Sequence, residues 1–190
     1  MRALKARVYS IMIGNLSARV ARVEMTLAVM LAVSITVLIL LNVVTRSAGA
    51  ALYWVDELAI YAMAWMTFLS ASAALHFGHT VAVTILTDLL PPIIRHIAAK
   101  LVDLIVFAFA LAMFWFCWRW FSPLELARHG FDFKAFQGAT FNFIYAEPTT
   151  TLGIKKYWVW MVMWAFSIGA TLHSFTNLIG QNPADKKEES

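Results

Sequence analysis

Charged residues and cysteines are both scarce in this 190-residue sequence. Charged side chains make up 14% of the chain and hydrophobic ones 61%, whereas an ordinary soluble domain has about 25% charged and about 45 to 50% apolar residues. This excess of apolar residues is too large for one soluble core. The one cysteine, Cys117, excludes an intrachain disulfide, a CxxC redox pair and a thiolate-rich metal site. The composition therefore predicts a membrane protein and excludes a disulfide oxidoreductase.

Sequence motifs for catalysis and cofactor binding are absent as well. The chain contains no P-loop, HExxH, GxSxG or Rossmann fingerprint, so we expect no enzyme activity, no cofactor and no metal. Its 15 Lys and Arg outnumber its 11 Asp and Glu, but they lie at the ends of apolar runs. That distribution fits lipid headgroups rather than a nucleic-acid-binding stripe, so membrane lipids are expected partners and nucleic acid is not.

Four apolar runs are long enough to cross a hydrocarbon core, which takes about 20 helical residues. A single run inside lipid satisfies its backbone hydrogen bonds only as a helix. We therefore expect an all-α membrane protein whose domain, residues 25–178, has four transmembrane helices. The predicted spans are residues 25–44, 54–75, 97–118 and 158–178.

Aromatic and basic residues flank these spans and predict the topology. Aromatic rings that prefer headgroup depth mark three span ends, and the predicted anchors are Tyr53, Trp115, Trp118, Trp120, Tyr157, Trp158 and Trp160. With the N-terminus inside, nine of the 15 basic residues face the cytoplasm, including all those before residue 25. The positive-inside rule therefore predicts that both termini are cytoplasmic. Residues 179–190 are then a charged, frayed cytoplasmic tail.

Two segments outside the spans have helical features. Residues 1–24 are basic and, if helical, group apolar residues on one side, so they form either an interfacial helix or a solvated basic tail. The third loop contains Ser122-Pro123-Leu124-Glu125, which predicts a short helix capped by the Ser122 side chain and ended by Gly130. The phenylalanines that follow are too apolar for a free loop, so we expect this stretch at the membrane surface or against a partner.

Few ionisable residues lie within the runs, and each is costly in hydrocarbon. Asp56 and Glu57 lie one turn into the second span, close enough to Arg46 to pair across a short loop. Two interpretations stay open: acids in headgroup water at a helix N-terminus, or a buried pair or partner contact. Asp103 follows Lys100 at ordinary helical pair spacing, so a local ion pair or a proton-relay role is possible there.

The histidines raise a haem alternative, because ligation by two imidazoles needs rings that face each other from two helices. His76, His79 and His96 lie in or beside the second loop, and His129 lies in the third. His173 stands alone in the fourth span, where a hydrogen bond to a neighbouring helix is expected rather than ligation.

Residues 42–92 contain a pattern of a different kind. Arg46 ends the first span, the second opens with Trp54, Asp56, Glu57 and Leu58, and further pattern residues are Trp65, Phe68, Leu69, Gly78, His79, Val81, Val83, Leu90 and Pro91. This stretch resembles the DctQ-like small permease subunit of tripartite ATP-independent periplasmic (TRAP) transporters. The turn departs from the family pattern, since His76, Thr80 and Thr84 replace its Arg, His and Asp when Gly78 is aligned.

The resemblance implies a multi-pass subunit of an ion-coupled importer in the bacterial inner membrane, with organic acid as solute and sodium as coupling ion. It also implies two partners, a large permease subunit and a periplasmic solute-binding protein. In this interpretation the chain is a static scaffold, and Arg46, Trp54, Asp56 and Glu57 lie in charge pairs or near the docking surface of the binding protein. The alternative is a membrane anchor or haem-binding subunit of a respiratory complex.

Overall fold

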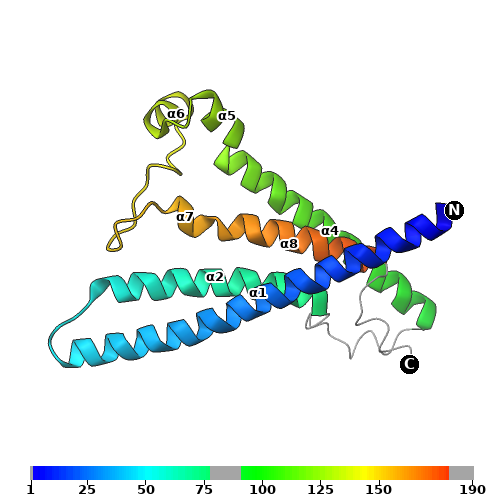
Figure 1. The fold of residues 1–190 in the computed structure, drawn as a ribbon, viewed down its shortest axis with the longest axis horizontal. Helices are drawn as coiled ribbons and strands as arrows, with labels where there is room; N and C mark the ends of the chain where they lie inside the picture. Colours follow the sequence, from blue (N-terminus) through cyan, green and yellow to red (C-terminus); the bar gives the residue numbers. More distant parts are fainter. Residues whose placement is uncertain (1, 78–90, 180–190) are drawn as a thin grey trace. The chain divides into compact units, whose positions relative to one another are not determined.

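The computed structural model describes residues 2–77 and 91–179, with side chains from residue 11 onward except that of Pro92, and the regular secondary structure in these ranges is helical. Within those ranges the one sheet-like feature is an isolated bridge between Pro148 and Lys155. The expected all-α class is thus confirmed for the described chain (Figure 1). The helices are α1 (Arg2–Ser47), α2 (Tyr53–Phe77), α4 (Pro92–Phe121), α5 (Pro123–Arg128), α6 (Phe133–Thr140), α7 (Tyr157–Trp160) and α8 (Val162–Leu178).

Three helical stretches in the described residues are long and apolar enough to cross a membrane. They are Ile11–Ser47, Tyr53–Phe77 and Ile93–Arg128, and they contain the first three predicted spans. The fourth predicted span, 158–178, falls on α7 and α8, which are separated at Met161, and α8 has 17 residues. Trp164 N and Ala165 N both donate to Met161 O, at 3.1 and 3.3 Å. Hydrogen bonding therefore continues across the division between α7 and α8.

The first helix differs from the division made on the sequence. α1 is one helix of 46 residues, so the backbone has no break near residue 25, where the basic segment was separated from the first span. The segment lacks proline, and Gly14 alone costs a helix only about 1 kcal/mol. Ser17 and Glu24 are buried, so this part of the segment is packed against protein rather than solvated.

The chain divides into two compact units, each considered by itself. Unit 1 consists of residues 1–26, 70–113 and 166–190, and unit 2 of residues 27–69 and 114–165. In unit 2 the end of α1 and the start of α2 form a helical hairpin (Figure 1). The Trp65 indole of α2 donates to Val159 O of α7 at 2.8 Å, and Leu69 and Val162 pack in a small apolar cluster with Ala28.

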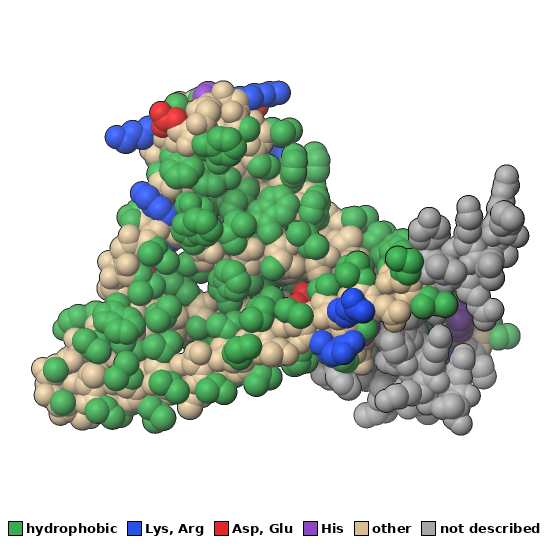
Figure 2. All heavy atoms as spheres, viewed as in Figure 1, with side chains coloured by type: hydrophobic (Ala, Val, Ile, Leu, Met, Phe, Trp, Pro, Cys, Tyr) green, Lys and Arg blue, Asp and Glu red, His purple; other side chains and the backbone are tan. Residues whose placement is uncertain are grey.

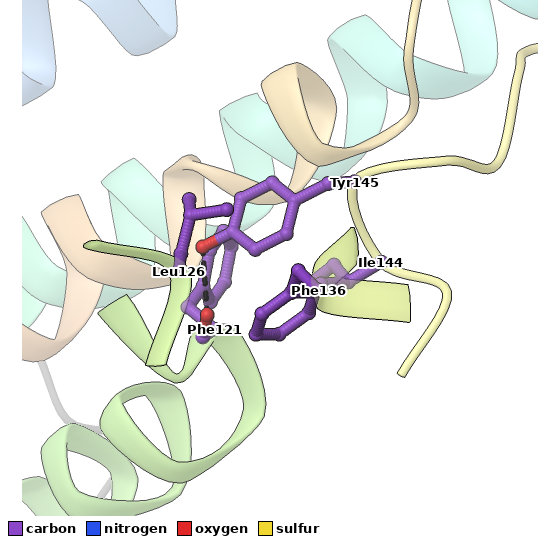
Figure 3. Packing of buried hydrophobic residues seen from close by; sticks show 5 residues of the cluster. All are labelled: Phe121, Leu126, Phe136, Ile144 and Tyr145. Carbon is purple, nitrogen blue, oxygen red and sulfur yellow. Dashed lines mark hydrogen bonds between the residues drawn. The ribbon is translucent and has the colours of Figure 1, made fainter. Parts of the chain in front are cut away.

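A second apolar cluster in unit 2 holds the long third loop together (Figure 3). It consists of Phe121, Leu126, Phe136, Ile144 and Tyr145. The Tyr145 hydroxyl donates to Phe121 O at 2.7 Å. The polar group of this buried tyrosine therefore has a hydrogen-bond partner. Burial, and to a smaller extent Tyr157, raise the pKa of Tyr145, so the phenol keeps its proton and stays a donor.

The short helix predicted in this loop is present, but its predicted cap is wrong. α5 begins at Pro123 and ends at Arg128, followed by Gly130 with φ of 62°, as the glycine stop predicts. Ser122 lies in the left-handed region, with φ of 41°, and makes no capping bond. Its hydroxyl instead donates to Arg119 O at 2.7 Å, because α4 runs directly into α5 and supplies a nearer carbonyl.

Candidate functional site

Unit 1 contains a cluster of buried polar side chains, here called the polar cluster. Its members are Ser17 and Glu24 of α1, Ser72 and His76 of α2, and His173 of α8. The least buried of them, Glu24, is 6% exposed. Because all five side chains are buried, each polar group costs free energy unless it finds a hydrogen-bond partner.

Hydrogen bonds link these five side chains into one chain across three helices. Ser72 Oγ donates to Glu24 Oε1 at 2.8 Å, and the other carboxyl oxygen lies 3.0 Å from His173 Nε2. Ser17 Oγ lies 2.8 Å from Nδ1 of both His173 and His76. Because a serine hydroxyl carries one proton, it donates to at most one of these nitrogens and accepts from at least one of them. The cluster is thus internally satisfied, and it ties α1, α2 and α8 together.

Helical spacing in the sequence places these groups on common faces. Ser17 and Glu24 are seven residues apart on α1, whereas Ser72 and His76 on α2 are four apart; both spacings return to one side of a helix. Gly169 and His173 are also four apart on α8. A Cβ atom at Gly169 would overlap both the Glu24 carboxylate and the Ser72 hydroxyl. The glycine therefore makes room for the Glu24–Ser72 hydrogen bond.

We expect Gly169→Ala to destabilise the protein, because the added methyl group displaces Glu24 or Ser72 from a buried hydrogen bond. The expected loss is about 1 to 3 kcal/mol of unfolding free energy, measurable by denaturation of the purified protein in detergent. Gly138→Ala is the matched control, since Gly138 lies within α6 with nothing near its added Cβ. That change should be neutral or slightly stabilising, and equal effects of the two substitutions would contradict the packing argument.

The structure corrects the expectation that His173 stands alone. His76 lies in α2 with its ring centroid 5.4 Å from that of His173 and the two ring planes tilted by 55°, so two imidazoles from different helices lie close together. The predicted hydrogen bond of His173 to a neighbouring helix is present, to Ser17 and Glu24. Both histidines turn Nδ1 to the same hydroxyl, so serine oxygen rather than space for a haem plane lies between them.

Unit 2 contains the charged residues singled out in the sequence. Arg46 Nη2 lies 2.6 Å from Asp56 Oδ2. The Asn42 amide bridges the pair, because its Nδ2 donates to the Asp56 carboxylate and its Oδ1 accepts from Arg46 Nε. These three side chains close the α1–α2 hairpin at its connecting loop. Both ion-pair partners are substantially exposed, so the pair adds little stability by itself.

Glu57 does not join Arg46 and instead holds the third loop, in an arrangement here called the Glu57 clamp. The carboxylate accepts from the backbone N–H groups of Thr150, Thr151 and Leu152, at 2.7, 2.6 and 3.1 Å. It also accepts from the hydroxyls of Thr151 and Tyr61, at 2.6 and 2.7 Å. Successive N–H groups pointing at one anion form a nest, so a carboxylate on α2 fixes a loop more than ninety residues later.

The remaining predicted residues are dispersed. Trp54, in the first turn of α2, is exposed and forms no part of the Glu57 clamp. Tyr53, Trp115, Trp118, Trp120 and Trp158 are exposed, while Tyr157 packs in the loop cluster and Trp160 packs near Trp120. Lys100 and Asp103 form the expected local pair, with 3.4 Å between Nζ and Oδ2. His79 lies outside the described residues.

Sequence reasoning missed Glu24 because it was counted in the basic segment before the first span. The available signal was the spacing of polar residues along each helix, since Ser17 and Glu24 are seven residues apart and Ser72 and His76 are four apart. No group of three or more His, Cys, Asp or Glu suited to a metal ion is found among the described side chains. The carboxylate, imidazole and hydroxyl groups of the polar cluster bind one another.

Comparison with known proteins agrees with these long apolar helices and with the motif at Arg46 to Glu57. No curated protein and no solved structure matches the chain. The family model of the DctQ component of tripartite ATP-independent periplasmic transporters matches residues 35–182, which is most of the sequence. The chain therefore belongs to the DctQ family and is a small membrane subunit of a TRAP transporter.

Proposed function

We propose that this subunit is a static scaffold in an ion-coupled importer of organic acids in the bacterial inner membrane. In this proposal the four spans 25–44, 54–75, 97–118 and 158–178 cross the bilayer with both termini in the cytoplasm. The large permease subunit carries the substrate and ion sites and moves against this scaffold. The periplasmic solute-binding protein docks at the opposite end from the termini.

The observation that carries the scaffold role is the bare apolar surface of long, unbroken helices. In α1, Val33, Val37, Leu40 and Val44 recur at helical spacing and are all exposed. α4 likewise exposes Leu101, Ile105 and Phe109. Figure 2 shows hydrophobic side chains spread widely over the described part of the visible face. Surfaces of this kind are covered by lipid or by another membrane subunit.

The polar groups support the same role, because they form hydrogen bonds and ion pairs within the protein instead of lining a route for solute. The polar cluster ties three helices through bonds among its own members. Arg46 with Asp56, and Glu57 with the third loop, hold the hairpin and the loop in place. Internally committed polar groups suit a part that stays still while another subunit moves, and they do not suit direct solute binding.

Reconstitution tests the proposal directly. Proteoliposomes containing the large subunit, with the binding protein and an ion gradient supplied, should take up solute only when this chain is present. The solute affinity of the binding protein should be the same with and without it, since the chain makes no solute contact. Uptake at the normal rate without this subunit would overturn the scaffold role.

A further inference from the structure

The third-loop lobe, residues 122–147 in unit 2, exposes phenylalanine rings and buries a tyrosine, the reverse of what is expected at a surface in water. Tyr145 is buried, and its hydroxyl donates to the carbonyl oxygen of Phe121 at the end of α4. Phe131, Phe141 and Phe143 are 68%, 80% and 54% exposed. Tyrosine has a polar group that suits a wet surface, whereas phenylalanine has none. Phenyl rings outside and the phenol inside fit hydrocarbon better than water.

The backbone holds two of these rings outward under strain. Phe131 has φ of 62° and Phe141 has φ of 54°, a region that bulky residues rarely occupy. Phe131 immediately precedes the capping residue of α6, and Phe141 ends that helix, so both ends of α6 present an exposed ring. Strain of this kind persists only where the surrounding structure fixes it, and it points to a use.

The opposite side of α6 explains why the rings cannot turn inward. Phe136, in the middle of α6, is fully buried and packs with Leu126 and Tyr145 in the cluster of Figure 3. Asp132 fixes the start of the helix by accepting from Lys134 N and Ala135 N. Rotation of α6 to bury its end rings would expose Phe136 and break this cap.

The neighbouring side chains favour lipid over a protein as the occupant of this surface. The last turns of α4, which lead into the lobe, expose Trp115 and Trp120, rings that prefer headgroup depth. Arg119 lies between them in sequence, and Lys134 lies on α6. Basic residues beside exposed aromatic rings suit a phospholipid surface.

We propose that the lobe inserts Phe131, Phe141 and Phe143 into the bilayer surface at the end where α4 leaves the membrane. The partner is the phospholipid itself, with the phenyl rings below the headgroups and Lys134 at phosphate depth. The lobe is then an anchor parallel to the membrane that limits tilting of α4. This anchor does not depend on the scaffold role, since it concerns lipid contact alone.

Spin-label accessibility tests the insertion. Cysteine is introduced singly by Phe131→Cys, Phe141→Cys and Phe143→Cys, and labelled in the assembled transporter in phosphatidylethanolamine–phosphatidylglycerol liposomes. The native Cys117 is buried. Labelling of the unsubstituted chain under the same conditions measures the background from this residue. Arg128→Cys is the control, because that side chain is highly exposed and charged. We expect the ratio of oxygen to nickel-chelate accessibility at the three phenylalanine positions to exceed that at Arg128 at least threefold.

Two other outcomes would overturn the proposal, and they differ in the accessibility of the labels to the two reagents. High nickel-chelate accessibility at the three positions places the rings in water. Low accessibility to both reagents means that a protein, either the large subunit or the binding protein, covers them. All three substitutions are on the exposed surface of the lobe, so folding should survive, and any two folded variants suffice for the comparison.

Discussion

Substitution of His173 by Leu is expected to lower the unfolding free energy by about 2 to 6 kcal/mol, because each of two buried groups that loses its partner costs about 1 to 3 kcal/mol. The change leaves a Glu24 carboxyl oxygen and the Ser17 hydroxyl buried without one of their partners. Leucine fills similar space but cannot replace either bond. Unfolding in mixed detergent micelles, followed by tryptophan fluorescence, measures the loss.

Matched variants separate this loss from general damage to α8. His173→Gln keeps polar contact and should retain part of the stability, while His96→Leu changes an exposed histidine and should have little effect. Glu24→Leu combined with His173→Leu should destabilise less than the two single changes added, because both buried partners leave together. Stability of His173→Leu equal to that of the parent would show that the hydrogen-bond chain does not hold these helices.

Glu57→Ala is expected to reduce solute uptake at least tenfold while the protein remains folded. The substitution removes the acceptor of three backbone N–H groups and two hydroxyls. Since Thr150 and Thr151 are exposed, water replaces the lost bonds at modest cost in stability, but the loop loses its fixed position. In the proposed function this loop lies near the docking surface of the binding protein, so the effect falls on uptake.

Hydrogen exchange and uptake, measured together, test each step of this prediction. Amides of residues 150–152 should exchange faster in Glu57→Ala, with an intermediate rate in Glu57→Gln, which keeps one acceptor oxygen. Asp56→Asn is the control, because it alters the adjacent charge without touching the loop. Unchanged exchange would contradict the clamp, whereas faster exchange with normal uptake would contradict the docking role.

The helical class and three long apolar helices could be predicted because they depend on local composition. A run of about 20 apolar residues in lipid is helical whatever its neighbours are. The fourth run was also recognised, but its division at Met161 was not, since no proline or glycine marks that point. The Ser122 cap failed because the choice of hydrogen-bond partner depended on α4 continuing as far as Phe121.

The candidate site was predictable only where its residues lie close together in the chain. Arg46 and Asp56 are ten residues apart and meet across one short loop, so a pair with one of the two acids was among the interpretations that the sequence left open. Glu57 meets a loop more than ninety residues away, and Glu24 meets His173 across 149 residues. The sequence contains no spacing rule for such contacts.

Membrane character, the helical class and membership of the DctQ pattern were determined by the sequence itself, because hydrophobic run length and short motifs are local properties. The joining of Ser17, Glu24, Ser72, His76 and His173, the capture of the third loop by Glu57, and the outward display of the lobe phenylalanines were decided only by tertiary structure. The physical reason is that a polar side chain in an apolar helix must find a partner. Which partner it finds depends on how helices distant in sequence are packed.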